Sequence, residues 1–72
     1  MITLEEIQER IIIVLNNSTL TQSEIARELN LTPSAISRMK KGEILPSVET
    51  LAKLCKLLNV ATNYILCLDK YR

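Results

Sequence analysis

Apolar residues recur in this chain at the three- and four-residue spacing of α-helices, and short polar stretches interrupt them. At 100° per residue, one face of the segment 4–15 is apolar and consists of Leu4, Ile7, Ile11, Val14 and Leu15. Charged residues occupy the opposite face, with Ile13 among them. Thr3 followed by Glu6 has the spacing of a capping box. The pattern therefore predicts a first helix over about 4–15.

Capping and turn-forming residues indicate four further helices. The residues whose hydroxyl groups would cap them are Thr21, Thr32, Ser47 and Thr62. The expected ranges are about 21–30, 33–40, 48–58 and 62–68. Asn30 and Gly42 stand where the second and third of the five helices end, and both residue types accept a left-handed backbone. The inward face expected for the fourth helix is Val48, Leu51, Ala52, Cys55 and Leu58, flanked by Leu54 and Leu57.

The length and composition indicate one small domain. The chain has 72 residues, and a chain this short buries only roughly 60% of the surface that it exposes when unfolded. Its apolar content of 47% is enough for a dense core. Outside 11–14, helix-forming residues outweigh the β-branched residues that strands prefer. We therefore predict an all-α fold, a compact five-helix domain over 1–72.

Histidine is absent from the sequence, which removes most catalytic and metal-binding chemistry. Neither a Ser-His-Asp nor a Cys-His nucleophile can be built. Zinc needs about four ligands, and Cys55 and Cys67 do not begin such a site. Both thiols lie in apolar runs, where a reduced, buried cysteine is a simpler interpretation than a disulfide. We expect a protein that is not an enzyme and that uses no metal, cofactor or small-molecule substrate.

The sequence also argues against a membrane protein. The apolar run 11–15 is much shorter than the ~20 residues that a helix needs to span a bilayer. The first charged residues of the chain, Glu5 and Glu6, are acidic, whereas a signal peptide begins with a basic region. We therefore expect a soluble protein in the cytoplasm, with no membrane partner.

The segment 21–41 has the arrangement of a helix-turn-helix, in which a turn of three or four residues joins two helices. The apolar residues placed where the two helices face each other and the core are Ile25, Leu29, Leu31, Ile36 and Met39. Ala26 is small where the helices must approach closely. No acidic residue occurs between Asn30 and Gly42, so the outer surface of the second of these two helices is polar and basic. Such a helix fits the major groove of DNA.

The residue types on that surface suit contacts with DNA. The candidate DNA-binding residues are Gln22, Thr32, Pro33, Ser34, Ser37, Arg38, Lys40 and Lys41. Arg38 is expected to bind guanine O6 and N7 through two hydrogen bonds. Ser34 and Ser37 can bond bases or phosphates, and Thr32 or Pro33 can pack against a thymine methyl group. The alternative is that these positions form only a solvated helix face.

Positive charge gathers in this segment, although the net charge of the chain is only +1. The formal charge by region is −2 over 1–16, +2 over 21–42 and +1 over 43–72. Lys40 and Lys41 suit phosphates, and the helix N-terminus at Gln22 offers free backbone N–H groups to another phosphate. So few cations predict modest DNA affinity for a single domain. The logarithm of the DNA-binding constant should fall with the logarithm of the salt concentration at a slope of roughly −3 to −6 per dimer.

Two stretches of the sequence resemble the Cro/C1-type helix-turn-helix family of phage and bacterial repressors. The first is 20–26 continued by 29–38, and the second contains Gly42, Pro46-Ser47 and much of 51–60. The likeness covers roughly 7–66, nearly the whole chain. It implies a five-helix domain of the lambda-repressor-like type that binds operator DNA as a dimer.

The resemblance also implies roles for individual residues. In the family, the residue at the position of Gln22 holds a phosphate and braces the recognition helix. The positions that face the groove are those of Thr32, Pro33, Ser34, Ser37, Arg38 and Lys41. This chain departs from the family at two positions: Asn30 replaces a usual glycine, and Lys41 replaces a frequent acidic residue. The second departure adds positive charge at the DNA surface.

Dimerisation would have to use this same domain. The candidate dimer or partner surface is Ile13, Tyr64, Ile65, Leu68 and Tyr71. Ile65 and Leu68 could equally belong to the core, and one exposed isoleucine at position 13 is ordinary for a globular protein. A symmetric dimer would place its two recognition helices ~34 Å apart, over a pseudo-palindromic operator in double-stranded DNA.

Two functional hypotheses follow. The first is a sequence-specific transcriptional regulator, a Cro-like repressor of a phage or prophage genetic switch. The second is an antirepressor or modulator that binds a partner repressor protein. It would use Ile13 or the helix-turn-helix surface itself, and the low net charge is the reason to consider it.

Overall fold

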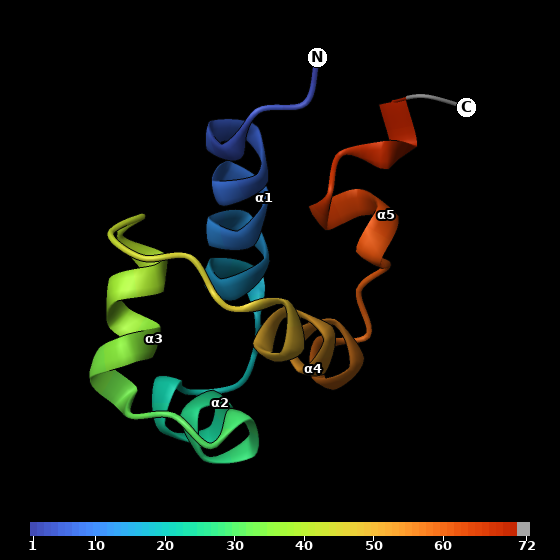
Figure 1. Ribbon diagram of the computed structural model, residues 1–72. Helices are drawn as coiled ribbons and strands as arrows, with labels where there is room; N and C mark the ends of the chain where they lie inside the picture. Colours follow the sequence, from blue (N-terminus) through green and yellow to red (C-terminus); the bar gives the residue numbers. More distant parts are fainter. Residues whose placement is uncertain (71–72) are drawn as a thin grey trace.

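The computed structural model describes residues 1–70 and contains only helices and loops over them. Its elements are α1 (Leu4–Asn17), α2 (Gln22–Leu29), α3 (Pro33–Lys40), α4 (Val48–Leu58), α5 (Thr62–Ile65) and the short 3-10 helix η1 (Leu68–Lys70). Figure 1 shows α1 in the middle of the molecule, with α3 on one side and α5 on the other. The predicted all-α fold of five helices is confirmed. None of the helices in the described part of the chain is long and apolar enough to cross a membrane.

Side-chain caps begin α1 to α4 at the predicted residues. The hydroxyls of Thr3, Thr21, Thr32 and Ser47 each accept a hydrogen bond from the backbone N–H three residues later, at 3.1–3.2 Å. At α2 the Glu24 carboxylate also accepts from the Thr21 N–H at 2.8 Å, which completes the capping box. This bond lowers the pKa of Glu24, because it favours the ionised carboxylate. The prediction that Thr62 caps α5 is wrong, because Thr62 is already the first residue of that helix.

The C-termini of α2, α3 and α4 share one geometry, the Schellman turn. The left-handed residues are Asn30 (φ 58°), Gly42 (φ 77°) and Asn59 (φ 55°). In each turn the following N–H bonds the carbonyl five residues earlier, at 2.8–2.9 Å: Leu31 to Ala26, Glu43 to Arg38, and Val60 to Cys55. The predicted ends at Asn30 and Gly42 are confirmed.

The core lies where α1, α2, α3 and α4 meet. Its buried residues are Ile11, Leu15, Ile25, Ala26, Leu29, Ile36, Met39, Leu54, Cys55 and Ile65. Cys67 is also buried, and both cysteines are free thiols as expected. Burial raises the pKa of the Cys55 thiol. The protein therefore relies on apolar packing, with the sulfur atoms serving as small apolar groups.

Three predicted inward positions are exposed, and two of them, Leu4 and Val48, lie in the first turn of a helix. Leu4 is 66% exposed at the start of α1, near the end of the molecule where the N-terminus projects (Figure 1). Val48 is 86% exposed at the first position of α4, and Ala52 is exposed one turn later. Because α4 packs on α2, its buried residues are Leu54 and Cys55. Leu54, which was expected only to flank the inward face, therefore lies at its centre.

The prediction that α5 runs to position 68 is also wrong, because the helix ends at Ile65. Cys67 adopts a left-handed backbone with φ 63°, and the chain continues as η1. The carbonyl of Tyr64 at this break accepts hydrogen bonds from the Cys67 N–H at 3.1 Å and from Arg10 Nη1 at 2.8 Å. Arg10 also pairs with Asp69 at 3.0 Å. A side chain of α1 thus stabilises the early end of α5.

Candidate nucleic-acid interface

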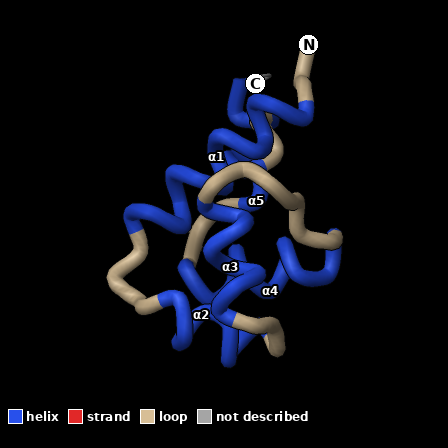
Figure 2. Tube along the Cα trace, turned by 90° about the vertical axis from the view of Figure 1, so that its left-hand side faces the viewer, coloured by secondary structure: helices blue, strands red, loops and turns tan. Residues whose placement is uncertain are grey.

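The helix-turn-helix consists of α2, the turn at 30–32 and α3 (Figure 2, where α3 faces the viewer). Ile25, Ala26 and Leu29 of α2 pack with Ile36 and Met39 of α3, and all five are buried. These contacts settle the rotation of α3 about its axis. Since its apolar side faces α1 and α2, its polar side is directed outward.

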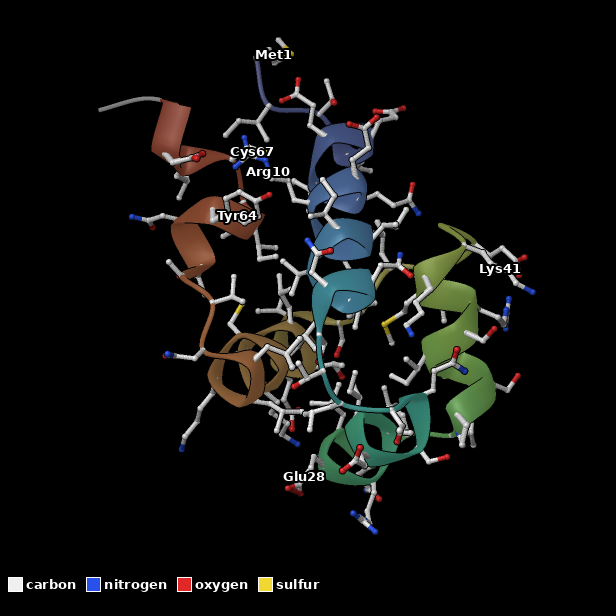
Figure 3. All side chains as sticks on the ribbon, turned by 180° about the vertical axis from the view of Figure 1, so that it is seen from behind. Met1, Arg10, Glu28, Lys41, Tyr64 and Cys67 are labelled. Carbon is white, nitrogen blue, oxygen red and sulfur yellow. The ribbon has the colours of Figure 1, made fainter. Side chains whose placement is uncertain are left out.

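The predicted DNA-contacting residues lie at the N-terminus of α2 and along α3. Five of them are exposed: Thr32, Pro33, Ser34, Arg38 and Lys41. Gln22, Ser37 and Lys40 are partly buried. Lys40 lies about 120° around the helix axis from Ser34, so it stands on the flank of the outer surface. Ser34, Ser37, Arg38 and Lys41 project from one face of α3. Figure 3 shows Lys41 at the C-terminal end of this helix.

The start of α3 is joined to α2 by a side chain. Gln22 Nε2 donates a hydrogen bond to the Pro33 carbonyl at 3.5 Å, across the turn. The hydroxyl of Thr32 accepts from the Ala35 N–H at 3.1 Å and so caps α3. Thr32 is exposed at this tip. The N-termini of both helices therefore lie side by side, and each has backbone N–H groups of the kind that bind phosphate.

The end of α3 is held by α1, which the sequence analysis did not predict. Gln8 Nε2 donates to the Gly42 carbonyl at 2.6 Å. A Cβ on Gly42 would lie 3.3 Å from Ile12 Cδ1, so the turn passes close to α1. Gln8 lies at the edge of the polar face of its helix and bonds a carbonyl 34 residues later. No local pattern could have indicated that partner.

An ion pair is a second feature that the sequence analysis missed. Arg38 Nε lies 3.6 Å from Glu43 Oε1, and both side chains are about half exposed. A signal for it was present. A glycine in the left-handed position predicts a Schellman turn, and this turn brings the residue after the glycine beside the residue four positions before the glycine.

The candidate dimer or partner surface is only partly available. Ile13 is 47% exposed and Leu68 is 44% exposed, whereas Tyr64 is partly buried. The Arg10 guanidinium lies over the ring of Tyr64, with its Cζ 4.4 Å from the ring centroid. Figure 3 shows both residues between α1 and α5. Ile65 is 0% exposed, so its placement on a surface is wrong: its side chain fills the core. Tyr71 lies outside the described residues.

A groove of about 610 Å³ runs beside Ile13, between the end of α1, the α1–α2 loop and the end of α4. Its lining residues are Ile13, Val14, Asn17, Ser18, Thr19, Leu20, Leu57, Leu58, Val60 and Tyr64. None of these side chains carries a charge at neutral pH. The exposed isoleucine therefore borders an uncharged depression lined by both apolar and polar side chains.

Comparison with known proteins identifies the family. A family model described as helix-turn-helix matches residues 11–65, about three quarters of the chain. No curated protein and no solved structure gives a significant match. The match includes the whole of α2, α3 and α4, and it confirms the predicted lambda-repressor-like fold. This family regulates transcription by binding double-stranded DNA and is not typically enzymatic. The chain belongs to the helix-turn-helix family of DNA-binding transcription regulators of the Cro/C1 type.

Proposed function

We propose that this chain is a sequence-specific, Cro-like repressor that binds a pseudo-palindromic operator as a homodimer. We place it in a phage or prophage genetic switch, in the cytoplasm of the bacterial host. The observation that supports it most is the outer surface of α3, where polar and basic side chains are exposed from Thr32 to Lys41 without a carboxylate among them. The buried apolar side of α3, Ile36 and Met39, directs that surface outward.

In this proposal α3 enters the major groove with its N-terminal end nearest the bases. Arg38 binds guanine O6 and N7, while Ser34 and Ser37 bond base edges or phosphates. Thr32 and Pro33 supply apolar contact to a thymine methyl group. A second set of groups contacts phosphates. It consists of Gln22 and the backbone N–H groups at the start of α2, together with Lys40 and Lys41.

The homodimer follows from the small number of cations. Few phosphate contacts per chain make binding by one domain weak, and a second domain on the same DNA strengthens it. We propose an interface that includes Ile13, Tyr64 and Leu68, with Tyr71 as a further candidate. Sedimentation should show two chains on one operator duplex. A single chain per duplex would refute the dimer.

Selection from a random-sequence duplex library tests the DNA-binding proposal. The protein should enrich a two-fold symmetric sequence, and Arg38→Ala should weaken binding to it by about 5- to 150-fold. Arg27→Ala is the matched control, because Arg27 is an exposed arginine of α2 outside the proposed contact set. The salt slope should be roughly −3 to −6 per dimer. Failure to enrich any sequence at low salt would sink the proposal.

The groove beside Ile13 favours a second candidate, a modulator that binds a partner repressor. An exposed apolar side chain beside an uncharged depression suits an apolar segment of another protein. The repressor encoded next to this chain would be captured by the wild type and lost with Ile13→Asp, while Arg38→Ala would retain it. Loss of regulation with Arg38→Ala, although this variant still captures the repressor, would instead support the operator-binding function.

A further inference from the structure

A carboxylate adjoins the basic surface of α3. Glu43 Oε1 lies 3.6 Å from Arg38 Nε, and the two side chains are 52% and 56% exposed. The contact is made through Nε, the atom on the side of the guanidinium. Both terminal Nη groups are therefore left for another partner. Arg38 is the residue that the proposed function assigns to guanine.

The backbone determines where Glu43 lies. Its N–H donates to the Arg38 carbonyl at 2.9 Å, and the Gly42 N–H donates to the Met39 carbonyl at 3.1 Å. Gln8 holds the Gly42 carbonyl from α1. The turn is thus supported on both sides, and it places the Glu43 backbone where its carboxylate reaches Arg38.

The two kinds of DNA contact open to Arg38 respond differently to this neighbour. A guanine edge is neutral and can accept from the two Nη groups while Glu43 remains at Nε. A phosphate is anionic, so the neighbouring carboxylate repels it even when the phosphate approaches the free Nη groups. We propose that Glu43 is a specificity-determining residue that weakens phosphate binding by Arg38 more than guanine binding. The inference rests on the proposed function.

Fluorescence anisotropy with two duplexes tests this role. One is the duplex enriched by the wild-type protein, and the other is a shuffled duplex of equal length and composition. Glu43→Gln should strengthen binding to the shuffled duplex about two- to fivefold per protomer, the range expected for loss of one exposed ion pair. Its salt slope should steepen by about 0.9 per protomer, because Arg38 gains a phosphate. Binding to the enriched duplex should change less than twofold, so discrimination falls.

Matched variants separate this role from a general effect of charge. Glu28→Gln makes the same charge change at an exposed site on α2, and Figure 3 shows Glu28 and Lys41 at opposite ends of the helix-turn-helix. It should leave discrimination unchanged. In an Arg38→Ala background, Glu43→Gln should have no effect on either duplex.

Three results distinguish the outcomes. Equal effects of Glu43→Gln and Glu28→Gln would overturn the inference, and so would an effect of Glu43→Gln that persists without Arg38. Wild-type protein that does not discriminate between the two duplexes would refute the proposed function itself. A circular dichroism spectrum that matches the wild type shows that each variant is folded.

Discussion

At the scale of single residues, the left-handed positions carry much of the structure. Asn30, Gly42 and Asn59 each end a helix with a positive φ between 55° and 77°, although only one of them is glycine. An asparagine accepts this conformation at modest cost because its short polar side chain can bond locally. Gly42 differs from the asparagines because Ile12 closes the space beside it.

Gly42→Ala should destabilise the protein by about 1–2 kcal/mol, since an L-residue with a plain Cβ is strained at this φ. The new Cβ would also press on Ile12 Cδ1 at 3.3 Å. Urea denaturation measures the change in the free energy of unfolding. Asn30→Gly is the control at a similar φ and should stay within about 0.5 kcal/mol of the wild type. An alanine variant as stable as the wild type would show that the turn adapts freely.

At the scale of elements, α3 is positioned by side chains at both ends. Gln22 bonds Pro33 at its start, and Gln8 bonds Gly42 just past its end. The eight-residue helix is too short to be stable alone in water, so these contacts and its buried face keep it helical.

Gln8→Ala should cost about 0.5–1.5 kcal/mol, the usual contribution of one hydrogen bond. Hydrogen exchange should quicken most at the Gly42 and Glu43 amides, whose bonds close the turn. Gln8→Glu has nearly the same shape but replaces the amide donor by a carboxylate. It should therefore be at least as destabilising, because two acceptors would face each other. Unchanged exchange at both amides would argue against a role for Gln8.

The cap of α2 predicts a dependence of stability on pH. The Glu24 pKa is lowered by the Thr21 N–H, so the folded state favours the carboxylate. Its contribution is fully present above the unfolded pKa, about 4.5, and is lost as the pH falls through the lower folded pKa. Glu24→Gln should show a smaller drop in Tm between pH 5 and pH 3 than the wild type. Glu28→Gln on the same helix should retain the full drop.

At the scale of the whole molecule, Arg10 connects α1 to the C-terminal segment. Its guanidinium bonds the Tyr64 carbonyl and the Asp69 carboxylate and covers the Tyr64 ring. The bond to Asp69 raises the pKa of Arg10. The side chain is 19% exposed, which makes this the most enclosed ion pair among those found in residues 1–70.

Arg10→Ala should lower Tm by several degrees, because the Tyr64 carbonyl loses a tertiary donor and the ring of Tyr64 loses its cover. Asp69→Asn removes the charge pair alone and should lower Tm less. Thermal unfolding followed by circular dichroism measures both. If Tm falls by the same amount in both variants, the ion pair rather than the bond to the Tyr64 carbonyl holds α5 in place.

Local sequence determined helices α1 to α4, their caps and the location of the helix-turn-helix. These features depend on residues within five positions of one another, as with Thr21 and Glu24 or Arg38 and Glu43. The outward surface of α3 was predictable for the same reason, since helical geometry relates Ser34 to Arg38 and Lys41.

Only the tertiary structure decided which end positions are buried and where α5 stops. Leu4 and Val48 follow the apolar pattern of their helices but lie in first turns that no neighbour covers. Arg10 acts on the end of α5 from 54 residues away, and Gln8 acts on the turn after α3 from 34 residues away. Such contacts form when the core brings distant helices together, and the spacing of residues along the chain does not encode which carbonyl a side chain will meet.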